Sequence, residues 1–424
     1  MAEALRDHRG RPVVAVTGIG ICTSLGVGVA DNWKAVTAGR SGIHRITRFP
    51  VTHLRTIIAG TIDYLPVEPK GLALAAGELA GDEAVVMSGL GKPGDFPGPL
   101  FIAIPPVEQE WKMRRKLFDA SRPNGGDAYD RMIEVAGGTN DRDEFEQLMY
   151  GYVGERLAER FGTKGAPISV TTACASGATG IQLGVEAIRR GETTAALCIG
   201  TDCSVTPEAV IRFSLLSALS NANDRPEEAE KPFSKNRDGF VIAEGSAALV
   251  LEDYDFARAR GAEILAVVRG AAEKSDDFHR TRSKPDGSAI ITALRNTFDD
   301  AGITPDEIDY INAHGTGTPE NDKMECFSLE QVFGERIRGV PISSNKSMIG
   351  HTLTSSGTIE AVLTVQTIQT GIIPPTINYK VPDPAINLDV VPNVAREQAV
   401  SRVLSNSFGF GGQNACLIIT AEPA

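Results

Sequence analysis

Residues 166–181 read APISVTTACASGATGI, and this stretch decides the fold. An apolar run turns at small residues and continues into a helical repeat of apolar side chains that reaches Ile188. Gly191 then supplies a C-terminal stop for that helix. The stretch predicts a buried strand, a sharp turn and a helix, with Cys174 at the N-terminus of the helix.

The same unit of a buried strand followed by a helix recurs along the chain. Strands are predicted at 11–22, 99–104, 195–201, 246–252, 263–270 and 308–313, with closing strands near 378–392 and 415–421. Helices are predicted at 31–38, 178–190, 288–301 and 357–371. Buried strands that alternate with helices predict a layered α/β architecture. We place the boundary between two similar halves near residue 262, which gives 1–262 and 263–424.

The charge and composition of the chain exclude several classes of function. The 424 residues carry a formal net charge of −12, which argues against a nucleic-acid or anionic-membrane partner. No stretch has the apolar length of a signal peptide or a membrane span. Six scattered cysteines, with no CxxC pair, predict neither a disulfide framework nor a zinc site. We therefore expect a cytoplasmic protein without a membrane span.

Residues 105–150 interrupt the alternation. They are charged, punctuated by glycine and helical in pieces. Two interpretations stay open, a solvated surface excursion and an interface or lid over the active site.

Cys174 is the first candidate for chemistry. The free N–H groups and the dipole at a helix N-terminus favour a thiolate, the nucleophilic form of cysteine. A cysteine in an apolar run is more often a small buried hydrophobe. On its own, therefore, Cys174 leaves both interpretations open.

Two histidines lie in polar, glycine-rich loops. The segment 312–319, NAHGTGTP, carries His314, and 343–351, SSNKSMIGH, carries His351 with Lys346 five residues before it. A single histidine is usually structural, but the chain has only six, and two in such loops favour a catalytic role. The segment 405–414, SNSFGFGGQN, predicts a tight loop that exposes N–H groups for an oxyanion hole, or simply a hairpin turn.

Together these four segments resemble the elongating β-ketoacyl-(acyl carrier protein) synthases of the thiolase superfamily. KPFSKNRDGF at 231–240 and IIPPTINYKVPDP at 372–384 fall where that family has similar stretches. The resemblance covers most of residues 11–421 and is weakest over 52–150. It implies a thiolase-like fold of two pseudo-duplicated halves in five layers, α/β/α/β/α, and a homodimer.

The resemblance also implies the reaction. Cys174 holds an acyl primer, and the N–H groups of Cys174 and Phe410 stabilise the carbonyl oxygen. Malonyl thioester on an acyl carrier protein then loses carbon dioxide, and His314 and His351 stabilise the resulting enolate. The enolate attacks the acyl group and gives a β-ketoacyl product two carbons longer. No cofactor is required for this chemistry.

Further roles follow from the same resemblance. Lys346 sets the electrostatics of the site, paired with Glu325 and near Asp322. The hydroxyl groups of the loop at 312–319 bind the pantetheine arm of the carrier. The loop that includes Gly409 is a gate that moves when the cysteine is acylated. A structural Na⁺ or K⁺ is implied as well. The residues concerned are Thr316 and Thr318 for pantetheine, Phe408 and Phe410 for the gate, and Asn312, Ala313, Glu360, Ser405 and Asn406 for the cation.

Docking of the carrier protein departs from the family pattern. Pro105 and Pro106 with the acidic run NDRDEFEQ occupy the region where the family has a glycine-rich segment, and Ser217 stands where arginine is common. The basic run of Lys112, Arg114, Arg115 and Lys116 is a candidate for a displaced landing site.

Three alternatives differ in their residues. A non-condensing, chain-length-determining partner subunit lacks the nucleophile that Cys174 supplies. A thiolase uses a second cysteine in a C-terminal CxG motif, where this chain has GFGG. A polyketide-type ketosynthase on the same fold stays open, as do the primer length and the pathway.

Overall fold

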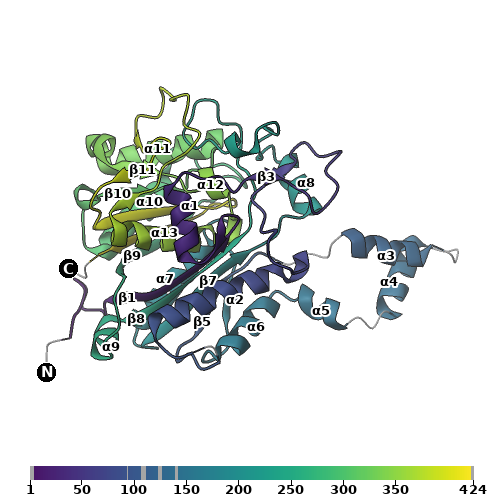
Figure 1. The fold of residues 1–424 in the computed structure, drawn as a ribbon, viewed down its shortest axis with the longest axis horizontal. Helices are drawn as coiled ribbons and strands as arrows, with labels where there is room; N and C mark the ends of the chain where they lie inside the picture. The colour runs from purple at the N-terminus through teal and green to yellow at the C-terminus, as the bar shows by residue number, and fades with distance from the viewer. Residues whose placement is uncertain (1–3, 93, 107–110, 123–126, 139–141, 422–424) are drawn as a thin grey trace.

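A mixed β-sheet runs through the whole molecule (Figure 1). The computed structural model describes residues 4–92, 94–106, 111–122, 127–138 and 142–421. The 12 strands of the sheet follow the order β13-β11-β10-β15-β16-β9-β1-β8-β7-β5-β6, and β2 pairs with β1 outside this path. The first half supplies β1 Val14–Thr23, β2 Gly26–Val27, β5 Leu100–Ala103, β6 Ile168–Val170, β7 Ala195–Asp202 and β8 Gly245–Asp253. The second half supplies β9 Ala266–Ser275, β10 Tyr310–Asn312, β11 Pro341–Ser343, β13 Asp389–Val390, β15 Arg402–Phe408 and β16 Gln413–Thr420.

The two halves of the sheet meet only at β1 and β9. Their ladder consists of Ala15 opposite Val267 and Val16 opposite Ala266. All other pairings join strands of the same half. Two small ribbons lie apart from the sheet: β3 His44–Arg45 with β4 Ile58–Ala59, and β12 Ile372–Ile373 with β14 Arg396–Glu397.

Helices complete five layers around the two sheet halves. One outer layer holds α2 Pro69–Ser88 and α6 Tyr152–Phe161, and the other holds α10 Ser288–Ala301 and α11 Pro319–Phe333. The middle layer holds α7 Ser176–Arg189 and α13 Ser356–Thr370, which contact strands of both halves. The remaining helices of the body are α1 Val29–Thr37, α8 Pro207–Leu215, α9 Tyr254–Ala259 and α12 Lys346–Ile349. The predicted thiolase-like, five-layered α/β fold is confirmed, while the boundary near residue 262 stays a prediction.

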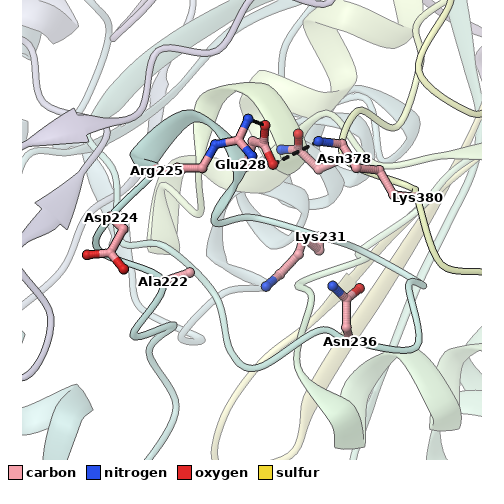
Figure 2. A pocket seen from close by; sticks show the side chains of 8 residues that line it. All are labelled: Ala222, Asp224, Arg225, Glu228, Lys231, Asn236, Asn378 and Lys380. Carbon is pink, nitrogen blue, oxygen red and sulfur yellow. Dashed lines mark hydrogen bonds and ion pairs between the residues drawn. The ribbon is translucent and has the colours of Figure 1, made fainter.

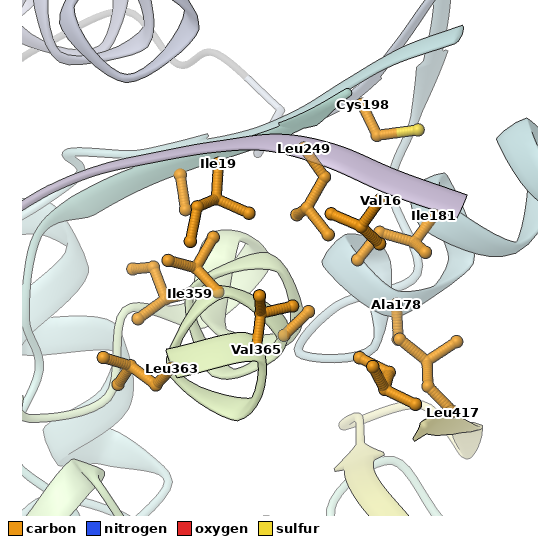
Figure 3. Packing of buried hydrophobic residues seen from close by; sticks show 14 of the residues in the cluster. Val16, Ile19, Ala178, Ile181, Cys198, Leu249, Ile359, Leu363, Val365 and Leu417 are labelled. Atoms are coloured by element: carbon orange, nitrogen blue, oxygen red, sulfur yellow. The ribbon is translucent and has the colours of Figure 1, made fainter. Parts of the chain in front are cut away.

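The core lies around the two middle helices. Figure 3 shows Ile181 of α7 and Ile359 of α13 packed among side chains of β1 and β8. The helices cross closely, because a Cβ on Gly177 would stand 2.5 Å from the backbone nitrogen of Thr358. Glycine at this position therefore sets the spacing of the middle layer.

One predicted strand is wrong. Of the residues 378–392, only Asp389–Val390 forms a strand, which pairs with β11, whereas β16 forms a long strand between β15 and β9. Pro382 and Pro384 lack the N–H group that a ladder needs, so this stretch cannot serve as a central strand.

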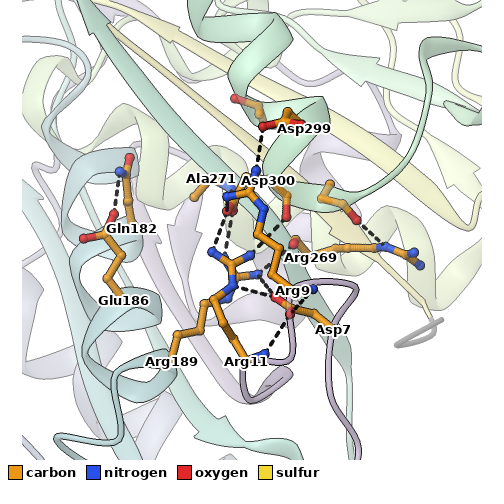
Figure 4. Close-up of polar contacts among 12 residues, drawn as sticks. Asp7, Arg9, Arg11, Gln182, Glu186, Arg189, Arg269, Ala271, Asp299 and Asp300 are labelled. Atoms are coloured by element: carbon orange, nitrogen blue, oxygen red, sulfur yellow. Dashed lines mark hydrogen bonds and ion pairs between the residues drawn. The ribbon is translucent and has the colours of Figure 1, made fainter.

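A charged network fastens the N-terminal segment to the end of α10 (Figure 4). Asp300 accepts hydrogen bonds from Arg11 Nη1 at 2.8 Å, from Arg189 Nη1 at 2.7 Å and from the Ala271 N–H at 3.0 Å. Asp7 accepts from Arg11 Nε at 2.8 Å. These ion pairs and hydrogen bonds hold the N-terminal segment, the end of α7, β9 and the end of α10 together.

The interruption at 105–150 forms an arm of three helices, which Figure 1 shows beside the body. They are α3 Trp111–Ser121, α4 Ala128–Gly138 and α5 Arg142–Leu148. Arg114, Arg115 and Lys116 of the basic run are exposed. The side chain of Lys112 and residues 107–110, 123–126 and 139–141 lie outside the described residues. Within the described part of the chain, no helix has the length and apolarity to cross a membrane.

Candidate active site

The turn between β6 and α7 carries Cys174. Ala173 adopts the left-handed conformation, with φ of 49°. Ser176 stabilises the turn, because its Oγ accepts from the Thr172 N–H at 2.8 Å and donates to the Ala173 carbonyl at 2.6 Å. This strained turn places the thiol two residues before the helix begins, facing the second half of the molecule.

The structure brings Cys174 and both histidines together. The ligand atoms of Cys174, His314 and His351 lie within 4.8 Å of one another, and all three residues are buried. Cys174 Sγ is 3.1 Å from His351 Nε2. The two imidazole rings meet edge to face, with centroids 5.4 Å apart. The sulfur comes from the first half and the histidines from the second, so the site forms where the halves meet.

Hydrogen bonds fix which ring nitrogen of each histidine carries a proton. The Leu353 N–H donates to His351 Nδ1 at 3.2 Å, and Lys346 Nζ lies 3.4 Å from His314 Nδ1. Nδ1 therefore accepts in both rings, and Nε2 carries the proton of the neutral form. Burial lowers the pKa of both histidines well below the usual 6.5, with Lys346 acting in the same direction. The site thus presents two neutral N–H donors beside the sulfur.

The position of the proton on each histidine ring also decides whether the cluster can bind a metal. A histidine that binds a metal through Nε2 normally donates its Nδ1–H to a neighbouring acceptor. Here Nδ1 of His351 faces an N–H donor, so Nε2 holds a proton and has no free lone pair. The cluster is therefore built to donate hydrogen bonds, not to ligate a metal.

Burial opposes the thiolate form that the N-terminus of a helix favours. Burial raises the pKa of the Cys174 thiol to about 11, although Lys346 and a hydrogen bond from the Phe410 N–H act in the opposite direction. The carboxylates of Asp202 and Glu360 act in the same direction as burial. Cys174 therefore rests as a thiol whose ionisation accompanies the reaction.

Lys346 has a different partner from the one expected. Its ammonium group forms a buried ion pair with Glu360 of α13, not with Glu325. It also donates to the His314 carbonyl at 2.8 Å. Burial raises the pKa of Glu360 to about 7, and Lys346 opposes this shift. Lys346 therefore links α13 to the loop that carries His314.

Glu325 and Asp322 hold the backbone of that loop. Glu325 accepts from the N–H groups of His314 at 2.9 Å and Gly315 at 2.8 Å. Asp322 accepts from the Gly317 N–H at 3.2 Å. Burial raises the pKa of Asp322 to about 6 and raises that of Glu325. Both acids act on the position of the loop, not on the reacting atoms.

The predicted pantetheine and gate residues lie next to this centre. Thr316 and Thr318 face each other with their hydroxyl oxygens 3.0 Å apart, and Thr318 also caps α11. The Phe408 ring lies 5.7 Å from that of His314, and Phe410 packs beside α8. The Gly409 N–H donates to the Gln413 carbonyl at 2.6 Å, which closes the loop.

The residues predicted to surround a monovalent cation offer unused oxygens. Glu360 Oε2 and Asn406 Oδ1 are buried and have no hydrogen-bond partner. Asn345 Oδ1 is also buried without a hydrogen-bond partner, although Asn345 was not among the residues predicted for the cation. The amide of Asn312 is already engaged with the Glu360 carbonyl at 3.0 Å and with Asn345. Unpartnered neutral and anionic oxygens suit a hard cation, so the residues fit Na⁺ or K⁺.

Sequence reasoning missed several groups that position the histidines. Phe240 packs edge to face on His351, with ring centroids 5.1 Å apart. Ser356 Oγ lies 3.0 Å from His351 Nδ1. The start of a helix just after His351 could have indicated Ser356. Phe240 gave no such signal, because its contact depends on a distant segment of the chain.

Comparison with known proteins now places the chain in a family. Family models match for the β-ketoacyl synthase N-terminal domain, over residues 124–257, and the C-terminal domain, over 265–380. Over 96% of both chains the sequence is 37% identical to the tetracenomycin polyketide synthase ketoacyl synthase alpha subunit of Streptomyces glaucescens. The chain belongs to the β-ketoacyl synthase family.

Other relatives include both kinds of condensing enzyme. This β-ketoacyl synthase is 33% identical to the 3-oxoacyl-[acyl-carrier-protein] synthase 2 of Coxiella burnetii, over 96% of this chain and 98% of the relative. A ketosynthase solved in complex with its type II polyketide synthase acyl carrier protein superposes with a TM-score of 0.87. It is 29% identical, and the match covers 97% of this chain and 100% of that one. The protein is an acyltransferase of the ketosynthase type.

Proposed function

We propose that the protein carries out a decarboxylative Claisen condensation with Cys174 as the nucleophile. The sulfur attacks the thioester of an acyl primer on an acyl carrier protein, and the acyl group moves to Cys174. The Cys174 proton ends on the released pantetheine thiol, so the exchange needs no external base. The Phe410 N–H, which points at the sulfur, then serves the carbonyl oxygen of the acyl-enzyme.

The two histidines serve the second half of the reaction. Malonyl thioester breaks its carbon–carboxylate bond, releases carbon dioxide and leaves an enolate. The Nε2–H groups of His314 and His351 donate to the enolate oxygen, which carries the developing charge. The enolate carbon attacks acyl-Cys174, the carbon–sulfur bond breaks, and a β-ketoacyl-carrier two carbons longer departs. The sulfur leaves as a thiolate and takes one proton from water to restore the Cys174 thiol. The paired donors beside a thiol are the observation that carries this proposal.

The nucleophile is tested by the mass of the protein after incubation with an acyl-carrier thioester. We expect the wild-type adduct to vanish in Cys174→Ser. Cys203→Ser is a matched control, because both cysteines are 7% exposed. An unchanged adduct on Cys174→Ser, or its loss in Cys203→Ser, would contradict the assignment.

The number of condensation cycles distinguishes the two pathways. Fatty-acid or specialised lipid synthesis requires one condensation per primer before the keto group is reduced. Poly-β-ketone synthesis is the second candidate, favoured by the 37% identity to a polyketide synthase alpha subunit. Purified protein with an acyl-carrier series and malonyl-carrier should release singly extended products. Multiply extended chains would support the polyketide role instead.

A structural cation is part of the same proposal. The unpartnered oxygens of Glu360 and Asn406, with the Ala313 carbonyl and Ser405, would hold Na⁺ or K⁺ and balance the buried carboxylate. Melting temperatures in KCl, NaCl and choline chloride at equal ionic strength test this. A specific ion should raise the melting temperature, and equal values in all three salts would argue against the site.

We further propose that two copies of the chain form a homodimer through the arm. Large apolar side chains are exposed there, including Tyr129 at 68%, Ile133 at 56% and Phe145 at 63%. Light scattering should give a dimer mass, which Tyr129→Lys with Ile133→Lys should reduce to that of a monomer. If the chain is inactive until a paralogue is added, it is one half of a heterodimer, and the homodimer proposal fails.

A further inference from the structure

Glu230 is a buried acid that has no role in the proposed reaction. It lies behind the loop that carries Thr316 and Thr318. A surface hollow of about 230 Å³ lies nearby, lined by Arg225, Glu228, Lys231 and Lys380 among others (Figure 2). Lys380 Nζ lies 2.8 Å from Glu228 Oε2, and Lys231 Nζ lies 3.2 Å from Asp238 Oδ1. These charges neutralise one another and indicate no ligand. Glu230 belongs to the same segment, but its side chain is fully buried, with 0% exposure.

The carboxyl group of Glu230 has one partner. The Val241 N–H donates to Oε2, and Oε1 has no hydrogen-bond partner. Among the described residues, no lysine, arginine or histidine nitrogen lies within ion-pair distance of it. A buried carboxylate without a cation is costly, so the group is held as the neutral acid.

The acid lies between two walls of the active site. On one side, its Oε1 would be 2.7 Å from a Cβ on Gly317, whose φ of 69° also favours glycine at this position. On the other side, Val241 accepts at its carbonyl from the His351 N–H at 2.7 Å. The two walls also meet directly, because the Gly239 N–H donates to the Gly317 carbonyl at 3.1 Å.

The charges around Glu230 come from three elements. Asp322 of α11 and Asp238 of the loop before Phe240 disfavour an anion at this position, and Lys346 of α12 favours one. Burial has the largest effect and raises the pKa of Glu230 well above 4.5. Lys231 and Arg237 face other acids, Asp238 and Asp322. The neighbouring charges therefore do not offset burial.

We propose that Glu230 is a positioning residue, whose uncharged carboxylic acid fixes the spacing between the loop of Thr316 and Thr318 and the backbone that holds His351. Its ionisation would place a second negative charge beside Asp322 and push the Gly317 loop away from the backbone at Val241. The loop of Thr316 and Thr318 would then shift relative to His351. The role in turnover rests on the proposed condensation.

The state of the acid is tested without any assay of activity. Glu230→Gln keeps the shape of the side chain but cannot ionise. The wild type must keep Glu230 protonated when folded, and this becomes tenfold harder with each pH unit above the usual 4.5. The melting temperature of Glu230→Gln minus that of wild type should therefore grow by about 4 °C or more between pH 5 and pH 8. The exposed Glu227→Gln is the control and should show no such trend.

The positioning role needs a second measurement. Glu230→Gln should keep KM for the acyl-carrier near the wild-type value, whereas Glu230→Ser, which leaves a gap between the walls, should raise KM about tenfold or more. The rate of Cys174 alkylation by iodoacetamide should change in Glu230→Ser alone, and it reports the His351 position even if the protein performs no condensation.

Two outcomes would overturn the proposal. A melting-temperature difference that stays constant from pH 5 to pH 8 would show that Glu230 is not held as the neutral acid. Unchanged KM and alkylation rate in a folded Glu230→Ser would show that it positions nothing. If the wild type performs no condensation while the pH trend and the alkylation rates behave as expected, the proposed function fails and the positioning role of Glu230 stands.

Discussion

Replacing Lys346 with methionine should make the stability of the protein depend on pH in a new way. Glu360 titrates near pH 7 in the wild type, because burial raises its pKa and the ion pair with Lys346 opposes the shift. Without Lys346 the pKa of Glu360 rises further, and the folded variant must keep a proton that the folded wild type loses.

The sign and size follow from proton linkage. Below about pH 7, Glu360 is protonated in both folded proteins, so the deficit of Lys346→Met is small and constant. Above pH 7 the variant continues to lose stability as pH rises, by about 1.4 kcal/mol per pH unit, while the wild type does not. By pH 9 the additional deficit reaches about 2.7 kcal/mol if Glu360 stays protonated.

Urea unfolding at pH 6, 7, 8 and 9 measures this deficit directly. Lys346→Met combined with Glu360→Gln is the matched control, because it removes the titrating group and should abolish the slope. Lys346→Met should also slow carbon dioxide release from malonyl-carrier about 100-fold, since His314 loses the donor at Nδ1. Acylation of Cys174 should persist. An equal deficit at pH 6 and pH 9, or the same slope in the double variant, would refute this reasoning.

Three further predictions concern the thiol, the middle layer and the N-terminal network. Alkylation of Cys174, followed by peptide mass, should accelerate with pH towards about 11, the value to which burial raises its pKa, and a plateau near pH 7 would disprove the buried-thiol account. In urea unfolding, Gly177→Ala should destabilise the protein by about 1–3 kcal/mol, because its Cβ would press on Thr358. Gly137→Ala is the control and should not destabilise the protein, because the space around Gly137 is open. Equal effects of the two substitutions would disprove the close crossing of the helices. Asp300→Asn should cost about 3 kcal/mol or more at pH 7, whereas the exposed Asp299→Asn should cost less than about 1 kcal/mol. The Asp300 pKa is lowered overall, because Arg189 and the other donors outweigh burial. The contribution of Asp300 to the free energy of unfolding should therefore fade as pH drops below about 4. A deficit of Asp300→Asn that does not change with pH would contradict this account.

The order of strands and helices followed well from local pattern. Apolar runs predicted β1, β7 and β8, and the periodicity after Cys174 predicted α7. The strand β15 was missed because its residues, RVLSNSF, mix polar and apolar side chains that the structure buries on both faces. Polar residues in a central strand carry no pattern that separates them from a loop.

The partners of buried charges could not be predicted in the same way. Three buried acids, Asp322, Glu325 and Glu360, were available to Lys346, and only the packing of α13 against the His314 loop decides among them. Glu230 was invisible for a similar reason, since nothing in its local sequence shows that Val241 and Gly317 enclose it. The burial that raises the pKa of the Cys174 thiol could not be predicted either, because the segments that cover the sulfur are distant in the sequence.

The narrow ladder between β1 and β9 has a consequence for how reactivity arises during biosynthesis. Each half of the chain holds its own set of paired strands, and among the described residues these strands pair across the halves only through Ala15 with Val267 and Val16 with Ala266. An incomplete chain emerging from the ribosome can therefore shape the Cys174 turn long before either histidine exists. The thiol meets its two N–H donors only when the C-terminal residues have been made and docked. Assembly of the finished molecule thus completes the site, because only then do the thiol and the two histidine donors lie together.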